Sequence, residues 1–241
     1  MERNPNNLSF LEHLDELRGR LIKSCLAVVI TTGIFYFFLD QTLTFMIKPV
    51  GKVVFTSPFD AFMARLTLLF FGGLFLALPY VIYQIWQFVA EGLSEEEKKY
   101  IRIFAPASFI LFALGLLFAY LIVIPTTIRF LLSYASEQII PMITVKSYIS
   151  FIGTFMLSFG VIFELPLIIL FLTKIGIATP AFLVQKRRHA IVLIFIVSAI
   201  LTPPDVISQL MMAIPLVVLY ELGVIFSKLT YKNEIVISGK F

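Results

Sequence analysis

The sequence predicts an all-α polytopic membrane protein, and three observations indicate this class. Hydrophobic residues make up 59% of the 241 residues and charged residues only 14%, whereas a soluble domain of this size carries about a quarter charged residues. The mean hydropathy is +0.97. The apolar residues gather in six segments, most of them near the length of about 20 residues that a membrane-spanning helix needs.

These six segments are the predicted transmembrane helices, at about residues 21–39, 66–90, 103–128, 147–173, 190–201 and 206–226. No polar stretch is long enough to fold separately, so residues 1–241 are expected to form a single transmembrane domain. The amino terminus lacks the pattern of a cleaved signal peptide, so the first span is expected to remain. Cys25 is the only cysteine, which excludes an intrachain disulfide and a cysteine-based metal cluster.

The distribution of lysine and arginine predicts the orientation in the membrane. Six spans place both termini on the same side. One set of loops carries five of the 19 basic residues, and the termini with the other loops carry the remaining 14; the five are Lys48, Lys52, Arg65, Arg129 and Lys146. Because segments rich in lysine and arginine stay inside, both termini are predicted to be cytoplasmic.

Two acidic clusters lie on this predicted cytoplasmic side. The first is a helix before the first span that carries Glu12, Asp15 and Glu16 beside a leucine stripe. The second is residues 94–99, Ser-Glu-Glu-Glu-Lys-Lys, just before the third span. Carboxylates suit a cationic partner, above all arginine, whose planar fork takes two hydrogen bonds from one carboxylate.

A structural interpretation of the same residues stays open. Ser9 with Glu12, and Ser94 with Glu97, each fit the S-x-x-E capping box, in which the glutamate closes the start of a helix. Arg18 has alternatives too, because it can pair with Asp15 or Glu12 or lie at the lipid headgroups.

Two connecting segments have patterns of their own. The outer loop from Asp40 to Arg65 mixes apolar residues with proline and glycine, which predicts short helices packed as a cap on the outer face. The stretch from Thr126 to Gln138 alternates apolar and polar residues and is predicted to be an interfacial amphipathic segment.

Glu164 is the only charged residue between Ser147 and Thr173, well inside the predicted fourth span. An ionisable group at this depth is expensive and is expected to face protein or a water-filled recess, which marks a functional site. Pro166 removes a backbone hydrogen bond and favours a kink beside the acid. The structural alternative is a neutral carboxyl that serves only as a packing contact between helices.

The last two spans are predicted to form a short hairpin. Only 14 residues separate Arg188 from Pro203, or roughly 21 Å of helix against a hydrocarbon core of about 30 Å. Pro203 and Pro204 predict a turn, and Asp205 can cap the next helix. Bilayer thinning or a partner helix would compensate for the difference between this helix length and the thickness of the hydrocarbon core. Three nearby residues are either a site for such a partner or ordinary interhelical contacts, namely Thr202, Gln209 and Met211.

Catalysis is poorly supported by the sequence. His13 and His189 both lie at the membrane edge, and no metal-ligand spacing, G-x-S-x-G motif or glycine-rich phosphate loop is present. We therefore expect a protein that is not an enzyme, with no metal, no cofactor and no nucleic-acid partner.

The chain resembles the TatC family, the C subunit of the twin-arginine protein translocase. The matching stretches span nearly the whole chain in the order of the family, and the ordered set is more specific than any one motif. They are residues 13–20 (HLDELRGR), 57–62 (SPFDAF), 78–88 (LPYVIYQIWQF), 159–166 (FGVIFELP), 201–206 (LTPPDV) and 213–215 (AIP).

The resemblance implies a concave six-helix bundle with an external cap and short last two helices, located in the cytoplasmic (inner) membrane. It implies a receptor that binds signal peptides with two adjacent arginines and assembles with single-span TatA/TatB-type subunits. This oligomeric complex would export folded proteins with the protonmotive force.

Site residues follow from the same resemblance. Glu16 and Glu97 would face the arginine pair, with Arg18 and Phe88 nearby. Glu164 would be the polar group of the membrane recess, and the partner-subunit contact would comprise Thr202, Asp205 and Gln209. The two residues before Glu97 are acidic here, where family members often show basic residues or histidine, so the carboxylate that takes each arginine stays open.

Two other function classes remain as alternatives. A small proton-coupled secondary transporter would use Glu164 as its ion site, although such proteins usually place several polar groups at the midplane. A scaffold that merely anchors other membrane subunits would bind them without Glu16 and Glu97.

Overall fold

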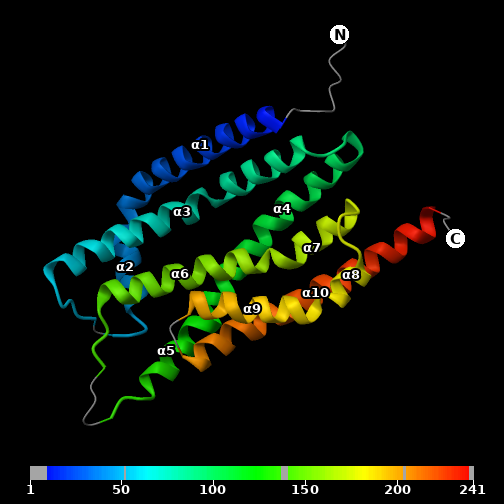
Figure 1. Cartoon of the computed structure of the whole chain (residues 1–241). Helices are drawn as coiled ribbons and strands as arrows, with labels where there is room; N and C mark the ends of the chain where they lie inside the picture. Colours follow the sequence, from blue (N-terminus) through cyan, green and yellow to red (C-terminus); the bar gives the residue numbers. More distant parts are fainter. Residues whose placement is uncertain (1–9, 52, 137–140, 203–204, 239–241) are drawn as a thin grey trace. The chain divides into compact units, whose positions relative to one another are not determined.

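The structure, a computed structural model, describes residues 10–51, 53–136, 141–202 and 205–238, with side chains from residue 12 to residue 231 within these ranges. In this part of the chain every regular element is a helix, apart from an isolated bridge between Val54 and Thr144. Figure 1 labels the α-helices. In chain order the elements are α1 (Phe10–Phe35), a 3₁₀ turn (Tyr36–Phe38), α2 (Leu39–Ile47), α3 (Pro58–Glu91), α4 (Glu95–Phe118), a π-helical turn (Ala119–Val123), α5 (Ile124–Leu132), α6 (Val145–Phe163), α7 (Leu165–Lys174), α8 (Pro180–Gln185), α9 (Arg187–Leu201) and α10 (Val206–Ser238).

The chain forms two compact units. The first comprises the described residues up to Phe109 together with Met142–Gly153, and the second comprises Ile110–Pro141 together with the chain from Thr154 onward. Helices α4 and α6 each contribute residues to both units. The single domain expected from the sequence therefore stays a prediction, and each unit is described by itself below.

Five helical stretches are long and apolar enough to cross a membrane, namely Glu12–Ile47, Pro58–Glu91, Glu95–Leu132, Val145–Lys174 and Val206–Tyr231. They contain five of the six predicted spans, and the all-helical class is confirmed. The remaining predicted span is α9, which has only 15 residues and is about 22 Å long at 1.5 Å per residue. The count of six spans stays a prediction.

The first unit is held together by close packing of α1 against α3, which run side by side in opposite directions (Figure 1). A Cβ added at Gly73 would lie 2.0 Å from Thr32 Oγ1 and 2.6 Å from Thr32 Cα. In addition, the Thr31 hydroxyl donates a hydrogen bond of 2.7 Å to the Gly73 carbonyl. Small residues allow backbones to approach in this way where lipid gives no hydrophobic drive between helices.

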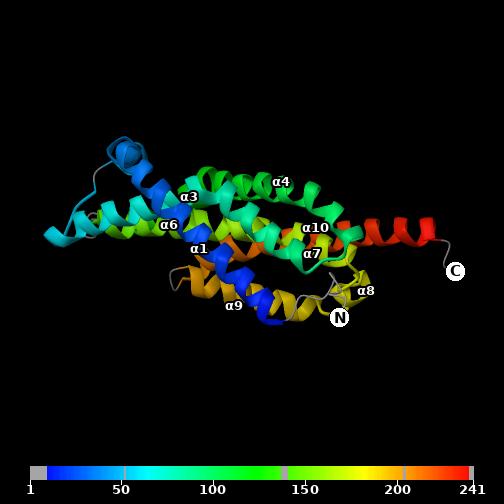
Figure 2. The ribbon, with the colours of Figure 1, turned by 90° about the horizontal axis from the view of Figure 1, so that it is seen from above.

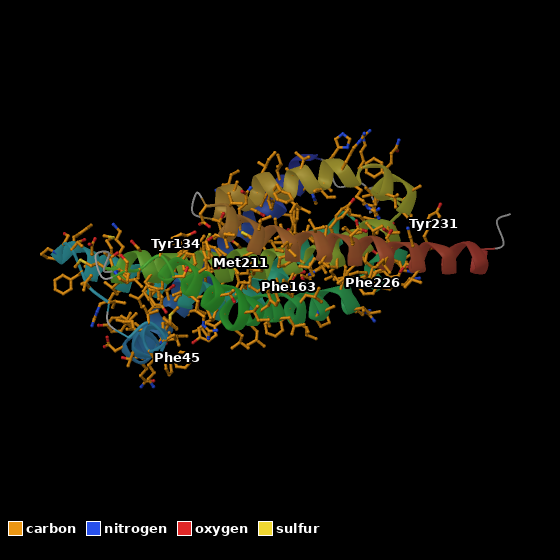
Figure 3. The ribbon with its side chains drawn as sticks, turned by 90° about the horizontal axis from the view of Figure 1, so that it is seen from below. Phe45, Tyr134, Phe163, Met211, Phe226 and Tyr231 are labelled. Carbon is orange, nitrogen blue, oxygen red and sulfur yellow. The ribbon has the colours of Figure 1, made fainter. Side chains whose placement is uncertain are left out.

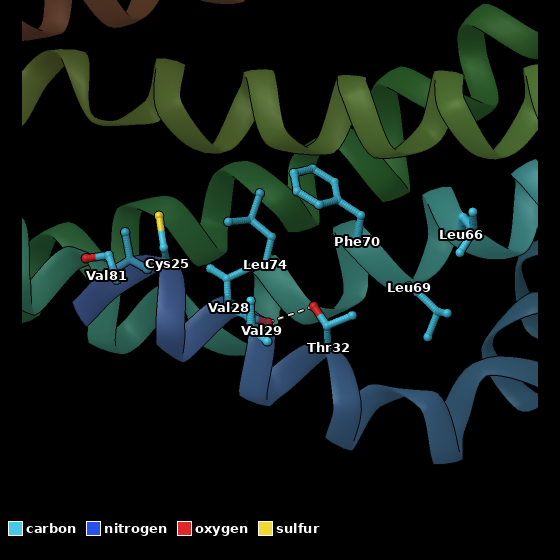
Figure 4. Close-up of a pocket in the computed structure, with 10 residues that line it drawn as sticks. Cys25, Val28, Val29, Thr32, Leu66, Leu69, Phe70, Leu74 and Val81 are labelled. Atoms are coloured by element: carbon cyan, nitrogen blue, oxygen red, sulfur yellow. Dashed lines mark hydrogen bonds between the residues drawn. The ribbon is translucent and has the colours of Figure 1, made fainter. Parts of the chain in front are cut away.

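An open apolar groove of about 620 Å³ lies between α1 and α3 (Figure 4). Cys25 and Val29 line it from α1, and Phe70 and Leu74 line it from α3. Thr32 also lines the groove, but its hydroxyl donates a hydrogen bond of 2.7 Å to the Val28 carbonyl within α1. The groove therefore presents an almost wholly apolar surface.

At the other end of α3, the predicted outer cap contains one short helix, α2, and an extended segment. The Val54 amide donates to the Ile143 carbonyl, and the Val145 amide donates to the Val54 carbonyl, both at 2.9 Å. The Tyr148 hydroxyl donates a hydrogen bond of 2.7 Å to the Met46 carbonyl. These bonds fasten the segment after the first span to the start of α6.

In the second unit α10 packs against α7, α8 and α9 (Figures 1 and 2). A Cβ at Gly223 would lie 2.7 Å from Ile169 Cδ1 and 3.2 Å from Pro166 Cα, so α7 and α10 are in close contact. The buried hydroxyls of Thr173 and Ser227 are hydrogen-bonded at 2.7 Å. This bond satisfies two polar groups that lie among apolar side chains.

Many large apolar side chains are exposed, including Phe45 at 55% and Phe226 at 45% (Figure 3). Large exposed apolar areas are rare on soluble monomers and mark contact with a membrane or a partner. Their presence agrees with the membrane-protein class.

Two elements differ from their predicted bounds. Both last helices were expected to be short, but α10 has 33 residues and continues to Ser238. No proline follows Pro215 in the sequence, so the helix continues beyond its apolar part. The segment from Thr126 to Leu132 lies in α5, which extends α4 through the π-helical turn. Its predicted interfacial position stays a prediction. The predicted turn at Pro203 and Pro204 lies outside the described residues.

The contact at Gly73 gives a stability test. Gly73→Ala should destabilise the protein by about 1–3 kcal/mol, because the new methyl group overlaps the Thr32 backbone and forces α1 and α3 apart. Thermal unfolding of the detergent-solubilised protein measures the effect.

Gly33→Ala is the matched control, since nothing lies within 4 Å of a Cβ added there. It should leave stability unchanged or raise it slightly through higher helix propensity. Equal stability of the Gly73→Ala and Gly33→Ala variants would contradict the close approach of α1 and α3 at Gly73.

Candidate functional site

Glu97 contacts the residue before α4, as the capping interpretation of the sequence expects. Its Oε2 accepts hydrogen bonds from the Ser94 amide at 2.9 Å and from the Ser94 hydroxyl at 2.7 Å. Glu95 instead pairs with Lys98 at 2.7 Å. Of the three consecutive glutamates, Glu97 is therefore the one that forms the glutamate half of a capping box, while the Ser94 hydroxyl donates to it instead of accepting from its amide.

Glu16 belongs to a cluster around Arg20, which the sequence analysis did not anticipate. Arg20 Nη2 lies 2.5 Å from Glu16 Oε1 and 3.4 Å from Glu91 Oε1. Arg20 Nη1 donates to Gln84 Oε1 at 3.3 Å. The Arg20 side chain is only 13% exposed, whereas the two glutamate side chains are 39% and 41% exposed. The carboxylates thus lie at the surface above a nearly buried guanidinium group.

Phe88 stacks on the His13 ring, with ring centroids 4.4 Å apart and an interplanar angle of 27°. A Cβ at Gly92, just after α3, would lie 3.9 Å from His13 Cε1. The beginning of α1, the end of α3 and the turn into α4 are therefore neighbours in the first unit. Arg18 is exposed in the same region.

The first unit thus brings Glu16, Phe88 and the turn before Glu97 to one end of the α1–α3 pair. The capping alternative is realised in part for Glu97, through its bonds to Ser94. Ser9 of the other proposed capping box lies outside the described residues. Neither Asp15 nor any other described acidic residue forms an ion pair with Arg18.

Glu164 lies at a break between α6 and α7 in the second unit. The Glu164 amide bonds to the Val161 carbonyl at 3.1 Å, and the Glu164 carbonyl accepts from the Ile168 amide at 2.9 Å. Pro166 is buried in the first turn of α7. The interruption that Pro166 predicted is present, and it places a half-buried carboxyl group where the helix changes from one segment to the next.

The end of α9 and the beginning of α10 contain the three predicted partner-contact residues, within the described part of the chain. The Thr202 hydroxyl donates to the Ser198 carbonyl at 2.8 Å, and Asp205 Oδ1 accepts from the Ser208 amide at 2.7 Å. Gln209 Nε2 donates to the Phe195 carbonyl at 3.1 Å. Asp205 is therefore the N-terminal cap of α10, as the sequence predicted.

Further polar atoms are buried near the end of α9 and the start of α10. The hydroxyls of Ser198 and Ser208 and the Oδ2 atom of Asp205 have no hydrogen-bond partner among the described residues. Buried polar groups are normally satisfied, so such a group of open atoms is unusual. Sequence reasoning missed both serines because nothing in their spacing distinguishes them from other small residues in an apolar helix.

Arg187 and Glu221 form an ion pair in the second unit that the sequence did not predict. Arg187 Nε lies 2.7 Å from Glu221 Oε1, and Arg187 Nη2 lies 2.8 Å from Glu221 Oε2. This two-pronged ion pair joins the start of α9 to α10. Within the described residues, no group of three or more His, Cys, Asp or Glu side chains is arranged to hold a metal ion.

Comparisons with known proteins agree on one family. The family model described as "Sec-independent protein translocase protein (TatC)" matches residues 12–215. A protein named TatC from Carboxydothermus hydrogenoformans is 41% identical over 232 residues, which are 94% of this chain and 96% of that protein. One from Desulforapulum autotrophicum is 36% identical over 241 residues, with 97% and 89% covered.

A solved structure is also similar. The crystal structure of a twin-arginine translocase receptor, TatC, superposes with a TM-score of 0.82 at 36% identity. The match covers 90% of this chain and 99% of that one.

Two substitutions distinguish the capping role of Asp205 from the effect of its negative charge. Asp205→Ala should lower the free energy of unfolding by about 1 kcal/mol through loss of the cap, whereas Asp205→Asn should stay close to the unmodified protein because asparagine caps equally well. Thermal unfolding in detergent measures both. If the asparagine variant lost as much stability as the alanine variant, capping would not be the structural role of Asp205.

Proposed function

The chain belongs to the TatC family, and from this premise we propose that it is the subunit that receives twin-arginine signal peptides. As a member of that family it is a core subunit of the twin-arginine protein translocase, an integral protein of the inner membrane and not an enzyme.

The arginine-binding proposal rests on the carboxylates at one end of the first unit. Glu16 is half-exposed, and Glu97 has one oxygen, Oε2, engaged by Ser94. Two guanidinium groups meet these two carboxylates, and each charge-assisted contact contributes about 1.5–3 kcal/mol when partly desolvated. Phe88 and Arg18 lie in the same region and border the bound peptide.

We further propose six spans with both termini in the cytoplasm. The 14 basic residues of the termini and their side of the membrane, against five on the other side, support this orientation. Under it the acidic end of the first unit faces the cytoplasm, where signal peptides arrive. Recognition of the arginines then requires no charge to cross the bilayer.

The end of α9 and the start of α10 are the proposed contact for single-span partner subunits of the TatA/TatB type. Its support is the set of Thr202, Asp205 and Gln209, of which Asp205 and Gln209 remain partly exposed. A polar side chain from a partner helix would contact these two residues. The short α9 leaves room in the bilayer for such a helix, and the assembled oligomer uses the protonmotive force for export.

Glu164 is the proposed polar group of a recess that receives the apolar part of the signal peptide. The helix break beside it supports this role, because an interrupted helix leaves backbone groups that a bound segment can satisfy. Membership of the translocase family does not favour the alternative of a proton-coupled transporter with Glu164 as its ion site.

Peptide binding tests the arginine proposal. A twin-arginine peptide should bind the detergent-solubilised protein, and Glu97→Gln should weaken binding about tenfold or more through loss of one charged contact. Glutamine still fits the capping box, so the start of α4 is preserved. Titration of a fluorescent peptide at two salt concentrations measures the affinity.

Glu96→Gln is the matched control, with the same change of charge one residue earlier. It should leave the affinity within about twofold of the unmodified protein, since Glu96 is a solvated surface residue. A peptide with lysine in place of both arginines should bind weakly. Absence of binding by the unmodified protein would contradict the receptor proposal.

Export assays test Glu164. Glu164→Ala should reduce export of a folded twin-arginine cargo and the crosslinking of partner subunits, because the recess loses its polar group. Ser150→Ala, a change at an exposed polar residue of α6, should have no effect. Unchanged export and crosslinking in Glu164→Ala would remove its functional role, and proton flux abolished by Glu164→Gln without partner subunits would instead support a transporter.

A further inference from the structure

The cluster around Arg20 contains a carboxylate that neither the sequence analysis nor the proposed site includes. Glu91, at the last position of α3, shares the Arg20 Nη2 atom with Glu16, at 3.4 Å and 2.5 Å respectively. The two glutamates come from different helices, 75 positions apart in the chain. One buried guanidinium group therefore holds two surface carboxylates next to each other.

The charges of the cluster do not balance. Glu16 and Glu91 carry two negative charges, and Arg20 supplies one positive charge that contacts both, with Gln84 as a neutral acceptor. Lys98 also attracts Glu91 electrostatically, but its own ion-pair partner is Glu95. Each glutamate contacts Arg20 through Oε1. The Oε2 atoms have no hydrogen-bond or ion-pair partner in the described part of the chain, and both side chains are roughly 40% exposed. A second cation can therefore approach from the solvent side.

Arginine fits this arrangement better than lysine does. Its planar fork has five donors and can bridge two neighbouring carboxylates, whereas an ammonium group is a point charge with a strong hydration shell. Without Arg20 the two glutamates would repel each other and separate. Arg20 also fixes their orientation from below, because its side chain is 13% exposed and is anchored by Gln84.

We propose that Glu91 is a further arginine-binding residue, which with Glu16 takes one guanidinium group of the signal peptide, and that Arg20 is the positioning residue for this pair. The inference rests on the proposed receptor function and adds the pairing of carboxylates to it. Glu97 takes the other arginine. The signal peptide thus needs two adjacent arginines because the protein has two carboxylate sites, each of which binds one of them.

The test is titration of a twin-arginine peptide into the full-length, detergent-solubilised protein. Glu91→Gln should weaken binding about tenfold, the loss expected for one charge-assisted contact. It should also reduce the preference for the arginine peptide over its lysine counterpart, since that preference comes from bridging. A general loss of folded protein would not change this ratio of affinities.

Asp15→Asn is the matched control, because it removes one exposed carboxylate from the same end of α1 without touching Arg20. It should leave both the affinity and the arginine preference within about twofold of the unmodified protein. Arg20→Gln should weaken binding by disordering the pair, and Arg20→Lys, which keeps the charge, should restore part of the affinity.

Two results would overturn the inference. One is Glu91→Gln behaving like Asp15→Asn, and the other is tighter binding by Arg20→Gln, which would make Arg20 a competitor for the site. If Arg20→Gln does not fold, Glu91→Gln and Arg20→Lys still decide. Binding that depends on Glu97 but not on Glu91 would reject only this inference, whereas no binding to the unmodified protein would reject the receptor proposal as well.

Discussion

Close approach of helix backbones is the constraint on which the rest of the structure depends. Lipid tails are as apolar as leucine, so helices gain little by exchanging lipid for each other unless they pack tightly. Glycine supplies this packing in both units, between α1 and α3 at Gly73 and between α7 and α10 at Gly223. A similar contact joins α4 and α6, where a Cβ at Gly115 would lie 2.5 Å from the Phe159 carbonyl oxygen. The polar groups near the helix ends take their positions from these contacts.

Sequence patterns predicted the features that depend on local chemistry. The apolar segments, the Glu97 and Asp205 caps and the helix break at Glu164 each follow from residues within one or two turns of each other. The Arg20 cluster is different, because Glu16 and Arg20 are spaced for an ion pair on one helix but Gln84 and Glu91 reach them only through the packing of α1 on α3. The open hydroxyls of Ser198 and Ser208 also depend on tertiary contacts. The predicted length of α10 was too short because hydropathy indicates where an apolar segment ends and not where a helix ends.

Polar groups of the second unit follow a common arrangement. Thr173 and Ser227 satisfy each other inside the α7–α10 contact, and Arg187 and Glu221 do so at the start of α9. Asp205 and Glu164 depart from this arrangement. Asp205 lies at the start of α10, and Glu164 lies between α6 and α7. Such interruptions are tolerated at membrane depth only where protein or water covers them. This is why the proposed partner and signal-peptide contacts fall at these two places.

The groove between α1 and α3 also makes the protein convenient for spectroscopy. Cys25 is the sole thiol in the sequence, it is exposed, and it lines this groove (Figure 4). A maleimide spin label or an environment-sensitive dye attached there would sample the groove at a single known position, with no mutagenesis of other cysteines. Spectra recorded with and without signal peptide, or with paramagnetic quenchers that partition into lipid or water, would then report what occupies the groove during transport.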